Sequence, residues 1–327
     1  MEQRRLGRNG PLVGAVGLGC MSFAGVYGSA DISQAHRTLA KALELGVTHL
    51  DTARVYGNGL SEEMIGAFIK DHPGRFTIAT KAGIVTQPQR RFDNSPDYLR
   101  ESLEGSLQRL GVDHVELFYI HRRDQTIPIE DVMGTMARFV EEGKIGGIGL
   151  SEIAPYTLER AVAVHPVMAV QNEYSLWTRL PELGLIQACE RHGTAFVPFS
   201  PVARGMFGIT PPSLETFGER DFRRSNPRFI EPHFSANLAK VAKLRDFAAE
   251  RGWSMPALAI AWVLHRGDHL VPIPGTRSPE HLEQDAAGAD LKLTAEDMAA
   301  IEAIAPAGFA HGPRYDEKPT VGPEDYC

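Results

Sequence analysis

Seven short apolar runs along the chain each end in polar or glycine-bearing residues, and this repetition constrains the fold more than any other feature. The runs are HLDTA, TIATK, FYIHR, IGLSE, AVQNE, VPFSP and VPIPGT. In a parallel α/β barrel all strands point the same way, so the residues just past each strand gather on one face, where such enzymes keep their chemistry. The polar residues that would gather there are Asp51, Lys81, His121, Ser151, Gln171, Ser200 and Thr276. Such side chains suit proton transfer and nucleotide binding rather than metal binding.

Helical stretches alternate with these runs. Segments 31–46, 60–71 and 95–111 have helical apolar spacing, and later helix–strand pairs follow within 129–150, 155–171 and 181–200. This alternation predicts βαβ units and a parallel sheet. We therefore predict one α/β domain over residues 1–327, a (β/α)8 TIM barrel. The expected helix boundaries are N-caps at Asp31, Ser61 and Ser95 with Pro96 in the first turn, and stops at Gly46, Gly111 and Gly143.

Three segments fall outside the alternation. The N-terminus has two short extended stretches around Asn9-Gly10, a dipeptide that tolerates the positive φ angles of a tight turn, so we predict a β-hairpin that plugs the barrel floor. Residues 201–234 are rich in Gly, Pro and Arg and lack a helical period, which favours a lid over bound cofactor on the C-terminal face, with simple disorder as the alternative. The tail, residues 305–327, is expected to be ordered only where it packs on the barrel.

Composition narrows the class of protein. The 327 residues carry a formal net charge of −7, which lacks the overall electrostatics of nucleic-acid binding. Three cysteines, few and odd in number, fit free thiols in a reducing compartment. Neither a signal-peptide core nor a membrane-length apolar run occurs, so we expect a cytoplasmic protein that acts on a small molecule and binds no membrane. The sequence leaves open whether it is a monomer or a homo-oligomer.

Several blocks of the sequence stand in a familiar order: GLGCMSFAG, HLDTARVYGNG, GLSE, TIATKAG, FYIHRRD, QNEYSLWTR, FSPVARGMF, DFRRSNPRF and IPGTRSPEHLE. They span almost the whole chain. In this order they resemble the aldo-keto reductase superfamily, closest to the branch of pyridoxal reductases and auxin-induced-like reductases. The resemblance implies NADPH-dependent reduction of aldehydes or ketones to alcohols and a catalytic tetrad of Asp51, Tyr56, Lys81 and His121.

The tetrad suits carbonyl reduction on physical grounds. Hydride delivery leaves an alkoxide-like oxygen that needs a proton and stabilisation of its charge, and Tyr56 is the expected proton donor. A free phenol titrates near 10, and an ammonium at about 4 Å would favour the phenolate by up to roughly 4 kcal/mol at an effective dielectric of 20. With Asp51 cancelling part of the field of Lys81, we expect a moderately lowered Tyr56 pKa. His121 would orient the carbonyl. Taken singly, each residue has a duller interpretation as a cap, a packing residue or a solvated charge.

Two neighbouring residues have a different expected role. Arg122 and Arg123 follow His121 directly, and we expect them to form ion pairs that support this loop.

Cofactor contacts follow from the resemblance. No GxGxxG follows a first strand, so a Rossmann module is not indicated. The resemblance implies Ser151 and Gln171 on the carboxamide and Tyr174 stacked on the nicotinamide. It places the pyrophosphate on Ser200, Pro201, Val202, Arg204 and Gly205, and the adenosine end on Gly275, Thr276, Arg277, His281, Gln284 and Asp285.

Departures from the family pattern affect this cofactor prediction. Glu152, His281 and the pair Gln284-Asp285 replace residues commoner in the family. Arg277 favours NADPH over NADH, because guanidinium binds the 2′-phosphate in a bidentate manner.

Aromatic residues suggest the substrate pocket, and two other function classes can be weighed. Met21, Phe23, Tyr27 and Trp177 would join Tyr56 in an apolar vestibule, although Met21 and Phe23 could equally be barrel packing. A cofactor-binding redox sensor of the same fold is the alternative function. A metal-dependent hydrolase would need HxH or a comparable cluster at strand ends, and the sequence has none.

Overall fold

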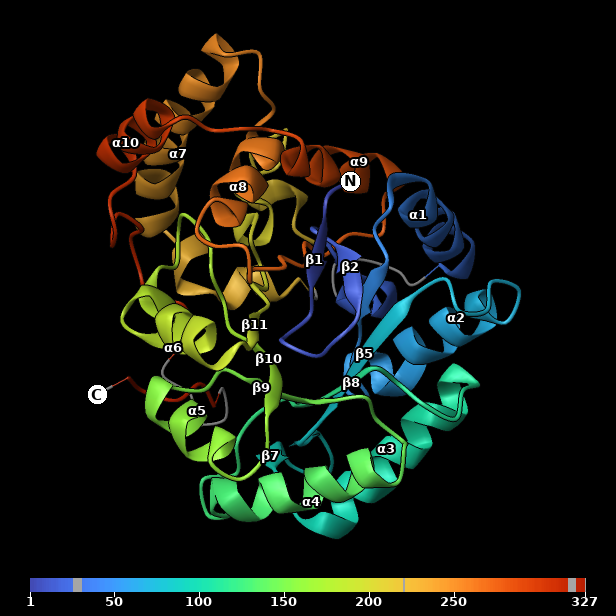
Figure 1. Cartoon of the computed structure of the whole chain (residues 1–327). Coiled ribbons are helices and arrows are strands. Elements are labelled where there is room, and N and C mark those ends of the chain that lie inside the picture. Colours follow the sequence, from blue (N-terminus) through green and yellow to red (C-terminus); the bar gives the residue numbers. More distant parts are fainter. Residues whose placement is uncertain (26–30, 220, 317–321, 327) are drawn as a thin grey trace.

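A curled parallel sheet lies at the centre of the molecule, with helices arranged around it (Figure 1). The computed structural model describes residues 1–25, 31–219, 221–316 and 322–326. Within these residues the sheet has seven strands in the order β11-β10-β9-β8-β5-β4-β3, and every neighbouring pair is parallel. The strands are β3 (Leu18–Gly19), β4 (His49–Asp51), β5 (Thr77–Ala82), β8 (Leu117–Ile120), β9 (Ile148–Ser151), β10 (Val167–Gln171) and β11 (Ala195–Phe196).

The segment 270–275 joins the two edges of this sheet. On one side Ile273 bridges Phe199, just beyond β11, and on the other side Gly275 bridges Gly19 of β3. Prolines at 272 and 274 have no N–H to donate, which explains why the pairing consists of isolated bridges rather than a regular strand. The backbone N–H groups of Gly17 and Gly19 donate to the carbonyls of these prolines, each at 2.9 Å. The expected TIM-barrel type of fold is confirmed, with an irregular eighth position.

Helices cover the outside of the sheet, and most expected boundaries are correct. The Asp31 carboxylate caps α1 by accepting from the N–H groups of Ser33 and Gln34, and Gly46 and Gly111 end α1 and α3 in left-handed conformations. Ser61 is not an N-cap, because α2 begins one residue earlier and the Ser61 hydroxyl is buried against Thr52. The helices are α1 (Ile32–Leu45), α2 (Leu60–Ile69), α3 (Pro96–Leu110), α4 (Ile129–Glu141), α5 (Pro155–Val162), α6 (Leu185–His192), α7 (His233–Glu250), α8 (Met255–Leu264), α9 (Pro279–Ala286) and α10 (Ala295–Ile304).

Alternate strand residues point into the barrel and out toward the helices. On β8, Leu117 and Tyr119 belong to the interior cluster, whereas Phe118 and Ile120 pack among the helix-facing residues. Since every second residue points inward, the next inward residue on each strand lies at its carboxyl end. Those end positions are Asp51, Lys81, His121, Ser151 and Gln171.

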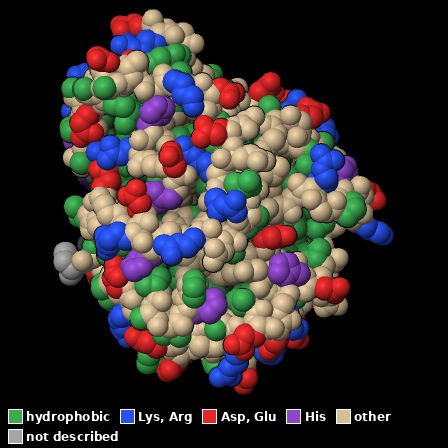
Figure 2. All heavy atoms as spheres, viewed as in Figure 1, with side chains coloured by type: hydrophobic (Ala, Val, Ile, Leu, Met, Phe, Trp, Pro, Cys, Tyr) green, Lys and Arg blue, Asp and Glu red, His purple; other side chains and the backbone are tan. Residues whose placement is uncertain are grey.

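The N-terminal hairpin closes the other end of the barrel, as expected. Strands β1 (Gln3–Arg5) and β2 (Leu12–Gly14) pair antiparallel, and Leu6 and Val13 reach the interior cluster. Arg4 fixes the hairpin by donating to the carbonyls of Leu264, Gly267 and Leu270 at 2.7–3.1 Å. The turn chemistry was predicted wrongly: the positive φ lies at Gly7 (+76°) and not at Asn9-Gly10. Acidic and basic side chains intermingle over this face of the molecule (Figure 2).

The long loop is built from short turns and held by aromatic packing. It contains the 3-10 turns η4 (Ala203–Gly205), η5 (Leu214–Thr216), η6 (Phe222–Ser225) and η7 (Pro227–Phe229), and α7 then starts at His233. Phe229 lies at the centre, with ring centroids 5.6 Å from Trp177, 5.9 Å from Phe217 and 6.0 Å from Phe234. In its described residues the loop is therefore packed rather than disordered.

The tail crosses the C-terminal face and contacts a small hairpin there. Gly322 packs so closely on Phe92 that a Cβ would lie 2.4 Å from the ring. Phe92 belongs to the antiparallel pair β6 (Ile84–Val85) and β7 (Arg91–Phe92). None of the helices in the described parts of the chain combines the length and hydropathy needed to cross a bilayer.

Candidate active site

A buried ammonium lies at the mouth of the barrel. Lys81 at the end of β5 is fully buried and donates to one Asp51 carboxylate oxygen and, at 2.7 Å, to the Thr52 carbonyl. The other Asp51 oxygen accepts from the Gln171 amide at 2.7 Å. Burial disfavours the charge on Lys81, but the Asp51 carboxylate and the nearby Tyr56 together raise the pKa of Lys81 above its usual value. The site therefore contains a permanent ammonium with one direct counterion.

Tyr56 and His121 complete the group that the sequence placed together. The Lys81 ammonium lies 5.3 Å from the centroid of the Tyr56 ring. The Tyr56 and His121 rings meet edge to face, with centroids 5.7 Å apart and planes at 85°. All four tetrad side chains thus converge at one point, from β4, the turn η2 (Tyr56–Gly59), β5 and the end of β8.

The pKa of Tyr56 moves opposite to the expected direction. Burial raises the pKa of the phenol, and this effect exceeds the lowering by Lys81, while the Asp51 charge adds to the increase. The expectation of a lowered pKa considered the ammonium and its counterion but left out the loss of water around the hydroxyl. In this structure Tyr56 is a neutral phenol at neutral pH and so carries the proton that a general acid needs.

His121 is neutral as well. Burial lowers its pKa well below the usual value, and the charges of Arg122, Lys81 and Arg90 lower it further. Its Nδ1 atom is buried and has no hydrogen-bond partner in the parts of the chain that the structure describes. A neutral imidazole carries one N–H and one lone pair, so it can donate a hydrogen bond to a carbonyl oxygen without a charge of its own.

The two residues after His121 brace the loop in different ways. Arg122 donates to the His121 carbonyl at 2.7 Å and to the Ser151 hydroxyl at 3.3 Å. Arg123 forms an ion pair with Glu324 of the tail at 3.4 Å, which confirms the predicted ion pair for Arg123. Ser151 and Gln171 thus lie beside the tetrad, with Gln171 already bonded to Asp51.

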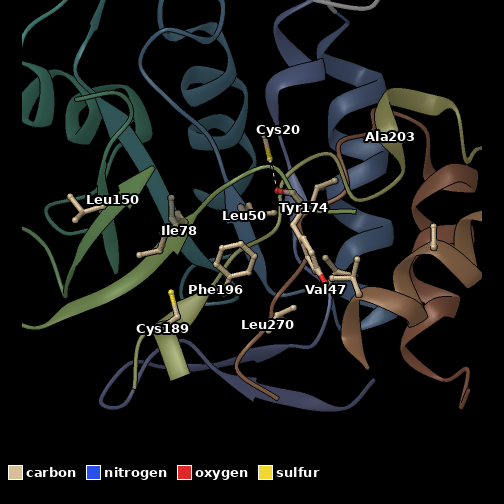
Figure 3. Close-up of a cluster of buried hydrophobic side chains, with 14 of the residues drawn as sticks. Cys20, Val47, Leu50, Ile78, Leu150, Tyr174, Cys189, Phe196, Ala203 and Leu270 are labelled. Atoms are coloured by element: carbon tan, nitrogen blue, oxygen red, sulfur yellow. Dashed lines mark hydrogen bonds between the residues drawn. The ribbon is translucent and has the colours of Figure 1, made fainter. Parts of the chain in front are cut away.

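Tyr174 does not lie where a nicotinamide could stack on it. Its side chain is fully buried among apolar residues that include Phe196, whose ring centroid is 5.9 Å away (Figure 3). Its hydroxyl donates to Glu182 at 2.7 Å, and the centroid of the Trp262 ring is 5.4 Å from its own. The prediction for Tyr174 is therefore corrected: the residue belongs to the helix-facing core. Phe199, just beyond β11, is half-buried and packs on the interior cluster, so its ring points into the barrel.

The segment after Phe199 has an unusual backbone. Ser200, Ala203 and Arg204 have φ angles of +53°, +51° and +56°, and Gly205 follows at +95°. Non-glycine residues rarely adopt such angles, and clusters of them mark functional sites. Pro201 is buried and Val202 half-buried in the same turn.

The predicted adenosine end lies around the N-terminus of α9. Gly275 is exposed, the Thr276 hydroxyl accepts from the Ser278 N–H at 3.0 Å, and the Arg277 carbonyl accepts from Thr38 at 2.7 Å. On α9 itself, His281 is exposed, Gln284 half-buried and Asp285 buried. Burial alone raises the pKa of Asp285 to about 8.

The predicted vestibule is only partly supported. Phe23 is buried among the helix-facing residues, and Trp177 is buried beneath the long loop against Phe207 and Phe229. Both are packing residues, and the prediction that they line a vestibule is corrected. Met21 is half-buried in the turn η1 (Met21–Ala24), and Tyr27 lies outside the described residues.

A second group of buried charges lies beside the tetrad and was not foreseen as a group. Arg314 of the tail binds Glu152 and lies 3.4 Å from Glu173, and Arg204 binds Glu173 at 3.0 Å. We call Glu152, Glu173, Arg204 and Arg314 the tail cluster. The arginines lower the pKa of Glu173 despite its burial. Partners separated by 31 to 162 residues leave no local pattern from which the cluster could be recognised.

Comparison with known proteins gives a consistent result. The model of the aldo/keto reductase family matches residues 15–306. The chain is 37% identical over 315 residues to the probable aldo-keto reductase 1 of Glycine max, covering 95% of this chain and 91% of that protein. It is 37% identical over 320 residues to the Schizosaccharomyces pombe aldo-keto reductase yakc, named with NADP(+), covering 95% and 94%. The glycerol dehydrogenase AKR11B4 of Gluconobacter oxydans superposes with a TM-score of 0.84 at 28% identity, covering 92% and 94%.

Proposed function

Since the chain belongs to the aldo/keto reductase family, we propose that it reduces aldehydes or ketones to alcohols with NADPH as hydride donor and Tyr56 as proton donor. The observation that carries this proposal is the convergence of a neutral phenol, a neutral imidazole and a buried ammonium at one point of the barrel mouth. A carbonyl placed there meets one group that can release a proton and one that can orient its oxygen.

The mouth has features that suit a nicotinamide nucleotide. The half-buried ring of Phe199 offers a flat apolar surface, and we propose it, in place of Tyr174, as the ring contact. Ser151 and Gln171 would hold the carboxamide, the left-handed turn 200–205 the pyrophosphate, and Gly275, Thr276 and Arg277 the 2′-phosphate. The name of the yeast relative, which includes NADP(+), supports the same choice. When bound, the cofactor supplies a hydride to the substrate carbon.

Tyr56 would supply the proton as charge develops on the carbonyl oxygen. Its raised pKa keeps the phenol protonated before the reaction, and the Lys81 ammonium stabilises the phenolate that forms as the proton leaves. Asp51 binds that ammonium and so holds it in place beside the phenol.

His121 would position the substrate. Because its pKa lies well below the usual value, its ring stays neutral across the physiological pH range and donates through one N–H. A neutral donor orients the carbonyl oxygen without competing with Tyr56 as an acid.

The test is NADPH oxidation in the presence of an aldehyde panel that includes pyridoxal and nitrobenzaldehyde. Wild-type protein should turn over, and Tyr56→Phe should bind NADPH with nearly unchanged affinity in fluorescence titration while its rate falls by at least two orders of magnitude. Tyr156→Phe, on an exposed tyrosine of α5, is the matched control and should behave as wild type. Near-normal turnover of Tyr56→Phe would remove the acid assignment. Tight NADPH binding without turnover on any aldehyde would instead favour a cofactor-binding redox sensor.

A further inference from the structure

Lys81 lies near two tyrosine rings, and one of them does not belong to the tetrad. The second is Tyr119 on β8, which pairs directly with Lys81 of β5 in the sheet register. The ammonium lies 5.6 Å from the Tyr119 centroid, close to its 5.3 Å separation from the Tyr56 centroid. Both distances fall within the range of cation–π contact.

The neighbouring strands make room for the Tyr119 ring. Gly149 of β9 is its register partner, and a Cβ on Gly149 would lie 2.2 Å from Tyr119 Cδ1 and 2.5 Å from Cε1. Gly149 has no left-handed φ angle, so the reason for glycine here is space and not backbone conformation. Ala79 and Ala169 belong to the same interior cluster and add little bulk. The interior is thus shaped around a large ring at residue 119.

The hydroxyl of Tyr119 does not explain its presence. The oxygen is buried, and the group that interacts with it is the uncharged Gln171 side chain, which is itself bonded to Asp51. Burial, followed by the Asp51 charge, raises its pKa well above the usual value, so the side chain stays a neutral phenol and offers Lys81 no counterion. What this residue offers to the Lys81 ammonium is therefore the face of its ring, and Tyr119→Phe separates that contact from any effect of the hydroxyl on Gln171.

We propose that Tyr119 is a positioning residue for the reductase reaction, whose ring holds the Lys81 ammonium between Asp51 and Tyr56. A cation–π contact stabilises a buried ammonium more than it stabilises a solvent-exposed ammonium, and Lys81 is fully buried. Asp51 binds the ammonium from one side, and the two rings restrict where it can lie relative to the Tyr56 hydroxyl. This proposal rests on the proposed function for its kinetic effect but not for the contact itself.

Other titratable groups face Lys81 and affect the same pH range. His49, two residues before Asp51 on β4, is buried with both ring nitrogens unpartnered among the described residues, and burial lowers its pKa. The groups whose charges act on Lys81 or respond to it are Asp51, His49, Tyr56, Cys20 and His121. None of them is altered by a substitution at Tyr119, so a shift in the pH profile of such a variant reports on the ring.

The experiment compares variants that keep or remove the ring. Tyr119→Phe keeps it, whereas Tyr119→Leu and Tyr119→Met remove it, and methionine provides a flexible apolar replacement should the leucine variant not fold. Phe118→Leu is the matched control, because it also removes a fully buried ring from β8. That ring faces Phe139 of α4 and not Lys81. Each variant is studied as full-length protein with 13C at lysine Cε, and Lys81→Met assigns the Lys81 resonance.

Loss of the ring should change both spectrum and kinetics. In Tyr119→Leu or Tyr119→Met the Lys81 Cε–H resonance should lose its ring-current shift, and kcat should fall about fivefold at unchanged Kd for NADPH. The high-pH limb of kcat should move up by about half to one unit, since a displaced ammonium lowers the pKa of the Tyr56 proton donor less. Tyr119→Phe and Phe118→Leu should keep the wild-type resonance and limb.

Three results would overturn a proposal, and they can be told apart. An unshifted Lys81 resonance in folded Tyr119→Leu or Tyr119→Met overturns the contact. Wild-type kcat and pH limb in those variants, despite a shifted resonance, overturn the positioning role. Absence of aldehyde turnover in the wild type overturns the reductase function, while the resonance still decides the contact.

Discussion

Buried charges meet at the ends of neighbouring strands in two regions of this molecule. At the tetrad, Lys81 has one carboxylate, Asp51, and a titratable phenol, Tyr56, beside it. In the tail cluster, two arginines face two glutamates, and every carboxylate is matched. The two regions use similar interactions at adjacent strand ends, but they differ in the kind of cation and in what else the cation faces.

The kind of cation suits each region to a different role: the tail cluster to joining segments of the chain, and the tetrad to proton transfer. A guanidinium stays protonated at any physiological pH and binds carboxylates through a planar fork, which suits a permanent joint between segments. The tail cluster joins the tail, the turn 200–205 and the ends of β9 and β10 in this way. An ammonium is a compact charge, and at the tetrad it acts on the phenol that we propose as the proton donor. We therefore expect activity to depend on the first region and stability on the second.

The largest effect should come from removing the tetrad ion pair. The double variant Asp51→Asn with Lys81→Met should lower kcat by about three orders of magnitude or more, because Tyr56 loses the charge that stabilises its phenolate. Its free energy of unfolding should change by less than about 1.5 kcal/mol, since replacing a whole buried pair is often neutral. Aldehyde kinetics and urea unfolding measure the two quantities. Turnover within tenfold of wild type would contradict the role of the pair.

Breaking the tail cluster should produce the opposite pattern. Arg314→Met leaves Glu152 without its ion pair and should cost about 3–5 kcal/mol of unfolding free energy, with kcat of the folded protein nearly kept. Arg160→Met is the control, because its exposed pair with Glu130 should be worth less than about 1 kcal/mol. Urea unfolding with parallel kinetics tests this. A stable Arg314→Met protein with low kcat would show that the two regions share one task.

Another buried carboxylate, Asp285, sharpens the comparison, because burial alone shifts its pKa. The pKa of Asp285 is raised to about 8. Since that lies above the unfolded value of about 3.9, the native state binds more protons between about pH 4 and 8, and stability should fall as pH rises through this window. Asp285→Asn removes this titration, so it should exceed wild type by a few kcal/mol more at pH 8 than at pH 5. Equal differences at both pH values in thermal unfolding would show that Asp285 is not buried without a counter-charge.

The smallest effect concerns Arg204, which belongs to the tail cluster and also to the proposed pyrophosphate turn. If it touches the cofactor, Arg204→Met should weaken NADPH and NADH binding alike, by about tenfold, because both carry a pyrophosphate. Arg277→Ala should weaken NADPH far more than NADH. Fluorescence titrations with both cofactors distinguish these cases. Unchanged affinities in Arg204→Met would mean that Arg204 only joins segments of the chain and does not contact the cofactor.

Much of the fold could be predicted because it depends on local patterns. Alternating apolar runs and helical segments predicted the parallel sheet, and single residues such as Asp31 and Gly111 marked helix ends correctly. The hairpin turn failed, since Asn9-Gly10 favours a positive φ that the structure uses at Gly7. A local sequence preference determines the backbone conformation only where tertiary contacts do not determine it.

The sequence predicted which residues meet at the site better than it predicted their pKa shifts. Residues at strand ends converge because the strands are parallel, so the tetrad was foreseeable. The direction of the Tyr56 pKa was not, because it depends on how much water the folded chain removes around one hydroxyl. Tyr174 and Phe199 both follow strands, and only the three-dimensional structure reveals that the first packs on Trp262 and the second faces the barrel interior.

The way in which the barrel closes affects how the chain can fold during its synthesis. Residue 19 of the first strand meets residue 275, so the ring is completed by a contact between segments about 250 residues apart along the chain. Until residues 270–275 have left the ribosome, β3 and β11 must remain open edges, able to pair with another nascent chain. Bringing the ends together late and at high entropic cost makes this seam a natural slow step in folding. The residues proposed to bind the 2′-phosphate, Gly275, Thr276 and Arg277, lie at this seam, so binding of the cofactor there would require that the barrel has closed.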